Sequence, residues 1–119
     1  SISGKTNEKL NIRGKIVINV EMIKLKEEIE EKISKAVEYL RSIGCREIFL
    51  FGSLTDGTFN EFSDIDVAVT GISSRNYFKA LVELTKIIDH DVDLVTLDFS
   101  SRDVEKKIRK RGEKIFAAT

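Results

Sequence analysis

The sequence predicts an α/β (α+β) fold in which helices flank a small mixed β-sheet. Three short apolar runs of strand length alternate with segments whose apolar residues recur at helical spacing. The chain has no proline and no low-complexity stretch, so nothing indicates an internal linker. Its 119 residues can bury a real core but are too few for two full domains. We therefore expect an N-terminal extension over residues 1–21 and one domain over residues 22–119.

The first part of the chain is expected to lead into a long helix. Residues 1–14 are polar and are interpreted as a loose lead-in. Alternating apolar residues over 15–20 indicate a short strand. Over 22–43 the apolar residues recur every three or four positions, with Lys and Glu between them, which predicts a helix. Gly44 is a natural stop for that helix.

Two strands separated by a tight connection are expected next. The run over 47–51 is short, mostly apolar and followed by Gly52, which predicts a buried strand. Residues 53–57 are expected to form a tight turn or a single helical turn. The run over 64–69 alternates between acidic and apolar residues, which predicts a second strand with two distinct faces.

A helix, a third strand and a last helix complete the expected order. A serine-capped helix is predicted to run to about residue 89, followed by a strand over 91–97. Ser100 or Ser101 is then expected to cap a helix that continues to about residue 111. The expected order is helix, strand, turn, strand, helix, strand and helix. This order favours a layered domain in which helices cover a small sheet.

Charge is balanced over the whole chain but unevenly distributed along it. The formal net charge is zero, which indicates neither a nucleic acid partner nor a membrane surface. From Leu54 to Asp98 there are nine acidic and three basic residues, whereas Phe99 to Thr119 holds seven basic and three acidic residues. An acidic centre is typical of a cation site. The basic end is most simply interpreted as a solvated helix face.

Cysteine usage and hydropathy indicate a cytoplasmic protein. Cys45 is the only cysteine, which excludes an intrachain disulfide and a cysteine metal cluster. The longest apolar run, Ile48–Phe51, is far too short to span a membrane. The N-terminal residues lack a signal-peptide pattern.

The most informative motif begins with Gly52-Ser53, directly after the first predicted buried strand. A glycine there lets the backbone turn sharply and lets a phosphate approach closely. Ser53 would open a short helix whose free backbone N–H groups can bind an anion. The alternative is a plain strand-to-helix turn with serine as its cap, so this pair alone is weak evidence.

The second part of the motif is Asp64-Ile65-Asp66, separated from Ser53 by ten residues. On a strand these two carboxylates share one face, about 6.6 Å apart. Like charges so placed repel unless a cation lies between them, and hard oxygen ligands suit Mg²⁺ or Mn²⁺. A solvated edge-strand face is the alternative. The apolar residues around the pair weaken it, because unpaired charge in a buried strand is costly.

A third carboxylate, Asp93, lies on the next predicted strand and could point the same way as Asp64 and Asp66. Three carboxylates from two strands could bind two metal ions about 4 Å apart. One ion would carry a triphosphate. The other would lower the pKa of an attacking hydroxyl, with Asp93 as metal ligand or base.

Five other residues are considered as rivals and assigned simpler roles. Asp91 shares the parity of Asp93, but its place at the strand start favours a turn or cap role. His90, the only histidine, is interpreted as a surface or helix-end residue, and Cys45 as a small apolar filler. Lys79 and Arg75 could reach phosphates from the helix after the aspartate strand, although solvated positions on that helix are favoured.

Together Gly52, Ser53, Asp64, Asp66 and Asp93 resemble the minimal nucleotidyltransferases (MNT) of the DNA polymerase β-type nucleotidyltransferase superfamily. The resemblance covers about residues 25–115. It implies a small mixed sheet with helices that binds a nucleoside triphosphate, usually ATP, with Mg²⁺. It further implies transfer of the nucleoside monophosphate to an acceptor hydroxyl with release of pyrophosphate. Many small members of this family are antitoxins paired with a HEPN-domain toxin, and some AMPylate a tyrosine of that toxin.

One departure from the family pattern concerns phosphate binding. Many minimal members carry Arg directly after Gly-Ser and a second Arg two residues later. This chain has Leu54-Thr55-Asp56-Gly57 instead, which removes positive charge and adds a carboxylate. This departure lowers the phosphate affinity that the resemblance implies, whereas the three metal-binding carboxylates of the pattern are all present, so a working site is still expected.

Three hypotheses for the function follow. The leading one is a Mg²⁺-dependent nucleotidyltransferase, in which Gly52 and Ser53 hold the triphosphate and the three aspartates bind metal. A chain this short has no room for a second domain to hold the acceptor, so a partner or a second copy is expected to supply that surface, and a protein such as a HEPN toxin is favoured. The strand at 15–20 could separately pair with another chain. The second hypothesis is an MNT-fold binding module that neutralises a partner by contact alone. The third is a regulatory nucleotide-binding domain, which would need no third carboxylate.

Overall fold

The computed structural model describes residues 10–12, 16–18, 20–60 and 62–118. The chain divides into two compact units, Ser1–Glu31 and Lys32–Thr119. In the first unit, β1 (Leu10–Ile12) pairs antiparallel with β2 (Ile16–Ile18). The predicted strand over 15–20 is thus confirmed, whereas the lead-in contains a strand that the sequence analysis missed. The predicted domain boundary at 21/22 stays a prediction.

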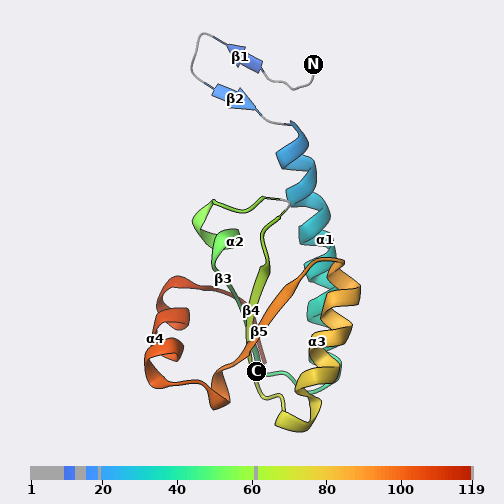
Figure 1. Cartoon of the computed structure of the whole chain (residues 1–119), viewed down its shortest axis with the longest axis vertical. Helices are drawn as coiled ribbons and strands as arrows, with labels where there is room; N and C mark the ends of the chain where they lie inside the picture. The colour runs from blue at the N-terminus through green and yellow to red at the C-terminus, as the bar shows by residue number, and fades with distance from the viewer. Residues whose placement is uncertain (1–9, 13–15, 19, 61, 119) are drawn as a thin grey trace. The chain divides into compact units, whose positions relative to one another are not determined.

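The second unit is built on a four-stranded sheet in the order β5-β4-β3-β6 (Figure 1). Its central strand β3 is antiparallel to both neighbours, whereas β4 and β5 run parallel. The sheet is therefore mixed, as the sequence predicts. Its strands are β3 (Glu47–Phe51), β4 (Ile65–Thr70), β5 (Val92–Thr96) and β6 (Glu113–Ala117).

Helices cover both faces of this sheet. They are α1 (Val20–Ser42), α2 (Ser53–Asp56), α3 (Ser74–Ile88), the 3-10 turn η1 (Leu97–Phe99) and α4 (Arg102–Arg111). Figure 1 shows α3 on one side of the sheet and α4 on the other. The parallel pair β4 and β5 is joined by α3, as parallel strands require a crossover.

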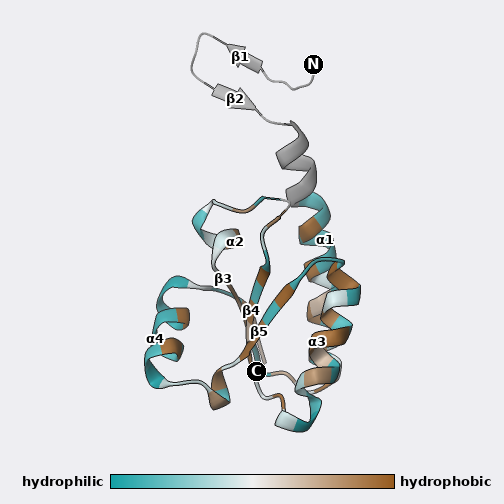
Figure 2. Cartoon of the chain, in the orientation of Figure 1, coloured by the Kyte–Doolittle hydropathy of each residue, from teal (hydrophilic) through white to brown (hydrophobic). Residues whose placement is uncertain are grey.

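Two apolar layers, one on each face, form the core. On the α3 face, Ile48 and Val67 of the sheet and Leu84 and Ile88 of α3 are at most 3% exposed. On the α4 face, a second cluster joins Phe49, Ala68, Leu97 and Ile108. Figure 2 shows the corresponding pattern, with hydrophobic residues along the strands and a hydrophilic outer surface on α4. Successive residues of β3 and β4 point to opposite faces of the sheet, so each strand contributes side chains to both layers.

The boundaries of most elements agree with the sequence analysis, and three details differ. The helix α4 is capped by Ser101, whose Oγ accepts a hydrogen bond from Val104 N at 3.2 Å, so the alternative cap Ser100 is wrong. Neither η1 nor β6 was predicted. The strand β6 opens with two charged residues, and its extended state depends on pairing with β3. No helix in the described part of the chain is long and apolar enough to cross a membrane.

Candidate functional site

The turn between β3 and α2 is shaped by Gly52. Its φ of 71° and ψ of −141° lie in a backbone region that residues other than glycine rarely adopt. A Cβ at this position would overlap Oδ2 of Asp66 and lie 3.0 Å from its Cγ. Glycine is therefore required twice, for the backbone conformation and for the close approach of a carboxylate from β4. Ser53 opens the single helical turn α2, as expected, and its phosphate role stays a prediction.

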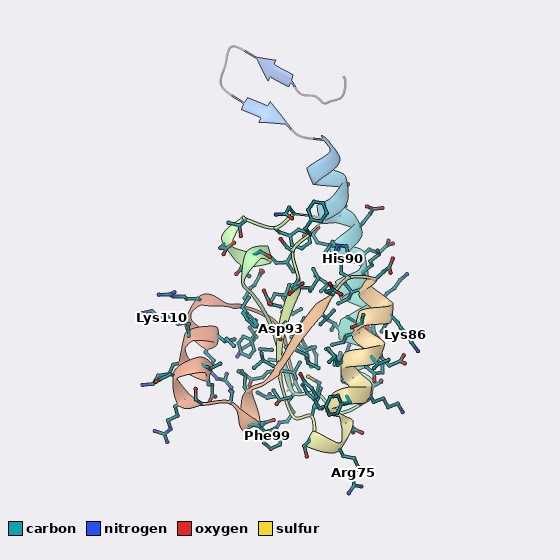
Figure 3. The ribbon with its side chains drawn as sticks, in the orientation of Figure 1. Arg75, Lys86, His90, Asp93, Phe99 and Lys110 are labelled. Atoms are coloured by element: carbon teal, nitrogen blue, oxygen red, sulfur yellow. The ribbon has the colours of Figure 1, made fainter. Side chains whose placement is uncertain are left out.

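Asp66 lies at the centre of the site. It is paired with Phe51 on the antiparallel neighbour and with Asp93 on the parallel neighbour. Paired residues on adjacent strands present their side chains on the same face, with backbones about 4.8 Å apart. The fold therefore brings the Gly52 turn, Asp66 and Asp93 side by side, as the sequence predicts. Figure 3 shows Asp93 over the middle of the sheet.

The pKa of Asp66 is shifted by burial and by the neighbouring carboxylates. Burial raises its pKa above the usual value, and the charges of Asp93, then Asp64, then Asp56 raise it further. Asp64 lies one residue before β4 and is exposed, and Asp93 is exposed as well. Each charge therefore disfavours the ionised form of the half-buried Asp66.

The side chains at this site are of the chemical type that hard divalent cations prefer. Their carboxylate oxygens repel one another, and a cation between them would relieve that repulsion. Asp66 with Asp64 and Asp93 would hold it. Among the described residues, no three His, Cys, Asp or Glu side chains already form a set that could hold a metal ion. The metal-binding role of these aspartates therefore stays a prediction.

The rival residues lie elsewhere or have structural roles. The carbonyl of Asp91 accepts a hydrogen bond from Ile65 N at 2.9 Å, which ties β5 to β4 at their starts. Cys45 is buried, and burial raises the pKa of its thiol to about 11, as expected for an apolar filler. Arg75 and Lys79 are exposed residues of α3, which covers the face opposite the carboxylates.

His90 directly follows Asp89, the C-cap of α3, which confirms its expected place at a helix end. Its side chain is half-buried, its ring centroid lies 6.2 Å from that of Phe59, and its Nδ1 has no hydrogen-bond partner among the described residues. It lines a cavity of about 500 Å³ with Ser63 and Asp91, beside the starts of β4 and β5. Figure 3 shows it at the same end of the sheet.

A second cavity, of about 450 Å³, adjoins the Gly52 turn, and we call it the α4 pocket. Sequence reasoning missed its two basic residues, Lys107 and Arg111, which belong to a run of similar residues. Each lies three residues after an apolar residue of α4, Val104 or Ile108, and this spacing was the available signal. The pocket is lined by Phe51, Gly52, Thr55, Asp56, Val104, Lys107, Ile108 and Arg111.

The chain is similar in sequence and fold to known proteins. Residues 27–119 match the family described as Polymerase beta, Nucleotidyltransferase. A toxin-antitoxin structure with AMP-PNP contains a chain 30% identical to this one, with a TM-score of 0.64 over 76% of this chain and 74% of that chain. The tri-AMPylated Shewanella oneidensis HEPN toxin in complex with its MNT antitoxin gives 26% identity and a TM-score of 0.59, over 78% and 73% of the two chains.

A mutant of the toxin-antitoxin MntA-HpeT is similar to the same degree, with 26% identity and a TM-score of 0.64 over 72% of this chain and 73% of that chain. No curated protein matches the sequence significantly. The family match covers most of the chain and includes all five motif residues. The chain therefore belongs to the polymerase beta nucleotidyltransferase family, in which it is a minimal nucleotidyltransferase domain.

Proposed function

We propose that this chain transfers a nucleoside monophosphate, AMP from ATP, to a hydroxyl group of a protein partner in the presence of Mg²⁺. The observation that carries the proposal is the juxtaposition of Asp66 and Asp93 in register beside the Gly52 turn. The HEPN toxin in one similar structure is AMPylated and in complex with an MNT antitoxin. By that likeness, the partner is a HEPN-domain toxin and this chain acts as its antitoxin.

Each site residue has its own role in the proposed reaction. The Gly52 turn and Ser53 hold the phosphates close to the carboxylates, and Asp64 and Asp66 keep the reacting groups in line. Asp93 accepts the proton of the acceptor hydroxyl while the oxygen of that hydroxyl forms a bond to the α-phosphorus. The bond from that phosphorus to pyrophosphate breaks in the same step. The three aspartates would hold Mg²⁺, which would supply positive charge that stabilises the transition state.

Transfer to the partner is the direct test. The chain is incubated with a HEPN-domain toxin, ATP and Mg²⁺, and the intact mass of the toxin is measured. We expect a gain of AMP units that is lost in Asp64→Asn/Asp66→Asn. The variant Asp89→Asn/Asp103→Asn removes the same charge at exposed positions outside the site and should keep the activity. A toxin that gains no AMP with the wild-type chain contradicts the proposal.

A second function, neutralisation by contact alone, is favoured by one observation. The segment after Ser53 carries no basic residue, and its Asp56 adds to the charges facing Asp66. The two functions make opposite predictions for the double aspartate variant. If Asp64→Asn/Asp66→Asn still suppresses the toxin fully in cells, contact is sufficient. If suppression is lost while the complex still forms, catalysis is required.

A further inference from the structure

The α4 pocket adjoins the carboxylates on one side only. Phe51, which lines it, is paired in register with Asp66 and so lies on the same face of the sheet. Ile108, which also lines it, packs in the cluster with Ala68 on that face. The pocket therefore lies on the β3 side of Asp66, whereas Asp93 lies on the β5 side.

Two cations of α4 line this pocket. Lys107 and Arg111 are one turn apart and share a helix face with the apolar residues Val104 and Ile108. Ile108 is 6% exposed and fixes that face toward the sheet. Within the described residues, the structure records no salt bridge for Lys107 or Arg111, so both charges remain available to a ligand.

Other basic residues of the same helix are placed differently. Arg109 donates to Glu47 and Glu105, which occupies its guanidinium. Lys106 and Lys110 are exposed and do not line the pocket. Figure 3 shows Lys110 pointing outward from α4, away from Asp93. All four of these residues, Lys106, Lys107, Lys110 and Arg111, are exposed, but only Lys107 and Arg111 line the pocket.

The turn itself supplies no positive charge. No residue from Ser53 to Gly57 is basic, and the one acid there, Asp56, also lines the α4 pocket. Asp56 accepts hydrogen bonds from Thr58 N at 3.0 Å and from Thr58 Oγ1 at 2.6 Å, within its own loop. A polyphosphate bound beside Gly52 therefore needs cations from another element, and α4 provides two in the cavity that Gly52 lines.

We propose that Lys107 and Arg111 bind the polyphosphate tail of the nucleoside triphosphate in the α4 pocket. This inference rests on the proposed function and names the side of the site from which the nucleotide enters. The tail extends from Asp66 across β3 toward α4. The acceptor hydroxyl then approaches from the opposite side, where Asp93 lies and negative charge would repel a phosphate.

The test compares two variants that lose the same charge from the same helix. Lys107→Gln/Arg111→Gln, the pocket variant, removes the two basic side chains that line the α4 pocket. Lys106→Gln/Lys110→Gln, the solvated-face variant, removes two basic side chains of the same helix that do not line it. Calorimetric titrations with ATP plus Mg²⁺, with tripolyphosphate and with AMP are run on the full chain and on both variants. Urea unfolding confirms that each variant is folded. The exchange Lys107→Arg/Arg111→Lys keeps both charges and serves as the rescue.

The pocket variant is expected to bind ATP at least about tenfold more weakly than the wild-type chain and to lose its binding of tripolyphosphate. Its affinity for AMP should change little, because AMP lacks the polyphosphate tail. The solvated-face variant and the rescue variant should bind all three ligands as the wild-type chain does. An equal loss in the solvated-face variant, or an equal loss for AMP, overturns the inference.

The outcomes also separate this inference from the proposed function. If the wild-type chain binds ATP with Mg²⁺ and the pocket variant binds it equally well, only the role of Lys107 and Arg111 is refuted. If the wild-type chain binds tripolyphosphate through these residues but transfers no AMP, the polyphosphate site stands and the transfer function fails. If the wild-type chain binds none of the phosphate ligands, both are refuted.

Discussion

At the scale of single residues, the space at position 52 is the strictest requirement of the site. Glycine there is needed for its backbone conformation and for contact with Asp66, whereas Gly57 has a positive φ of 83° but open space around it. The two glycines therefore separate backbone strain from steric overlap.

Replacement of each glycine by alanine measures the two effects. Gly57→Ala should cost about 1 kcal/mol through strain alone. Gly52→Ala should cost about 2–4 kcal/mol and weaken Mg²⁺-dependent nucleotide binding, because Asp66 must move. Urea unfolding and calorimetry check this. Equal costs for the two variants would show that the carboxylate does not lie against the turn.

The charge on Asp66 should reduce stability in the absence of a ligand. Burial and the neighbouring aspartates disfavour its ionised form. We expect Asp66→Asn to raise the free energy of unfolding by about 0.5–1 kcal/mol at pH 7 while abolishing AMP transfer. The gain should shrink in high salt, since ions screen the repulsion. A loss of stability in low salt would contradict this account.

The sequence predicted the carboxylates better than the cations. Asp64, Asp66 and Asp93 follow from motif spacing and strand parity, which need no knowledge of packing. Lys107 and Arg111 were not singled out, because Lys106 and Lys110 have the same charge and the same spacing, and only the distance from Val104 and Ile108 along the chain distinguishes the two pairs. Only the packing of α4 against the sheet decides which pair lines the pocket.

At the scale of elements, Glu47 joins β3 to its neighbours. Its carboxylate accepts hydrogen bonds from Arg109 of α4 at 2.9 and 3.1 Å and from Thr70 of β4 at 3.1 Å, and it lies 3.2 Å from Lys114 Nζ of β6. The hydrogen bonds from Arg109 are the main reason that its pKa falls to about 2. This cluster holds α4 in the place that forms the pocket.

Glu47 should therefore give the stability a defined pH dependence. A carboxyl whose folded pKa lies below its unfolded value near 4.5 stabilises the fold above that value, and this contribution is lost as the pH falls toward 2. Glu47→Gln should cost about 1–2 kcal/mol at pH 7, and the difference from wild type should shrink between pH 4.5 and 2.

Urea unfolding at pH 7, 5 and 3.5 measures this dependence, with Glu38→Gln as the control. Glu38 makes only an exposed pair with Arg41 at 3.7 Å and should contribute little. A constant difference between Glu47→Gln and wild type over this range would refute the electrostatic role of Glu47.

The elements that sequence reasoning missed depend on long-range pairing. The strand β6 lacks a strong alternating pattern, and its register with β3 shifts between Ile48 and Phe49. By contrast, β3 and α3 carry their periodicity in their own residues and were predicted to within a residue or two at each end. Local patterns specify such elements, whereas an edge strand needs its partner.

At the scale of the whole molecule, both sheet faces carry a core layer, and the α4 face also carries the candidate site. The α3 face is closed by apolar packing, and the α4 face carries the carboxylates at one end and the pocket beside them. The alternation within β4 produces both from consecutive residues. The fold class and the aspartate positions followed from this alternation, but the pocket required the packed structure.

The central claim is that Asp64 and Asp66 form a Mg²⁺-dependent nucleotide site, and calorimetry with ATP tests it most directly. The chain is titrated with ATP in the presence and absence of Mg²⁺, beside the variant Asp64→Asn/Asp66→Asn. We predict binding that requires Mg²⁺ and is lost in the folded variant. Equal binding by wild type and variant, or no binding by a folded wild-type chain, would contradict the account.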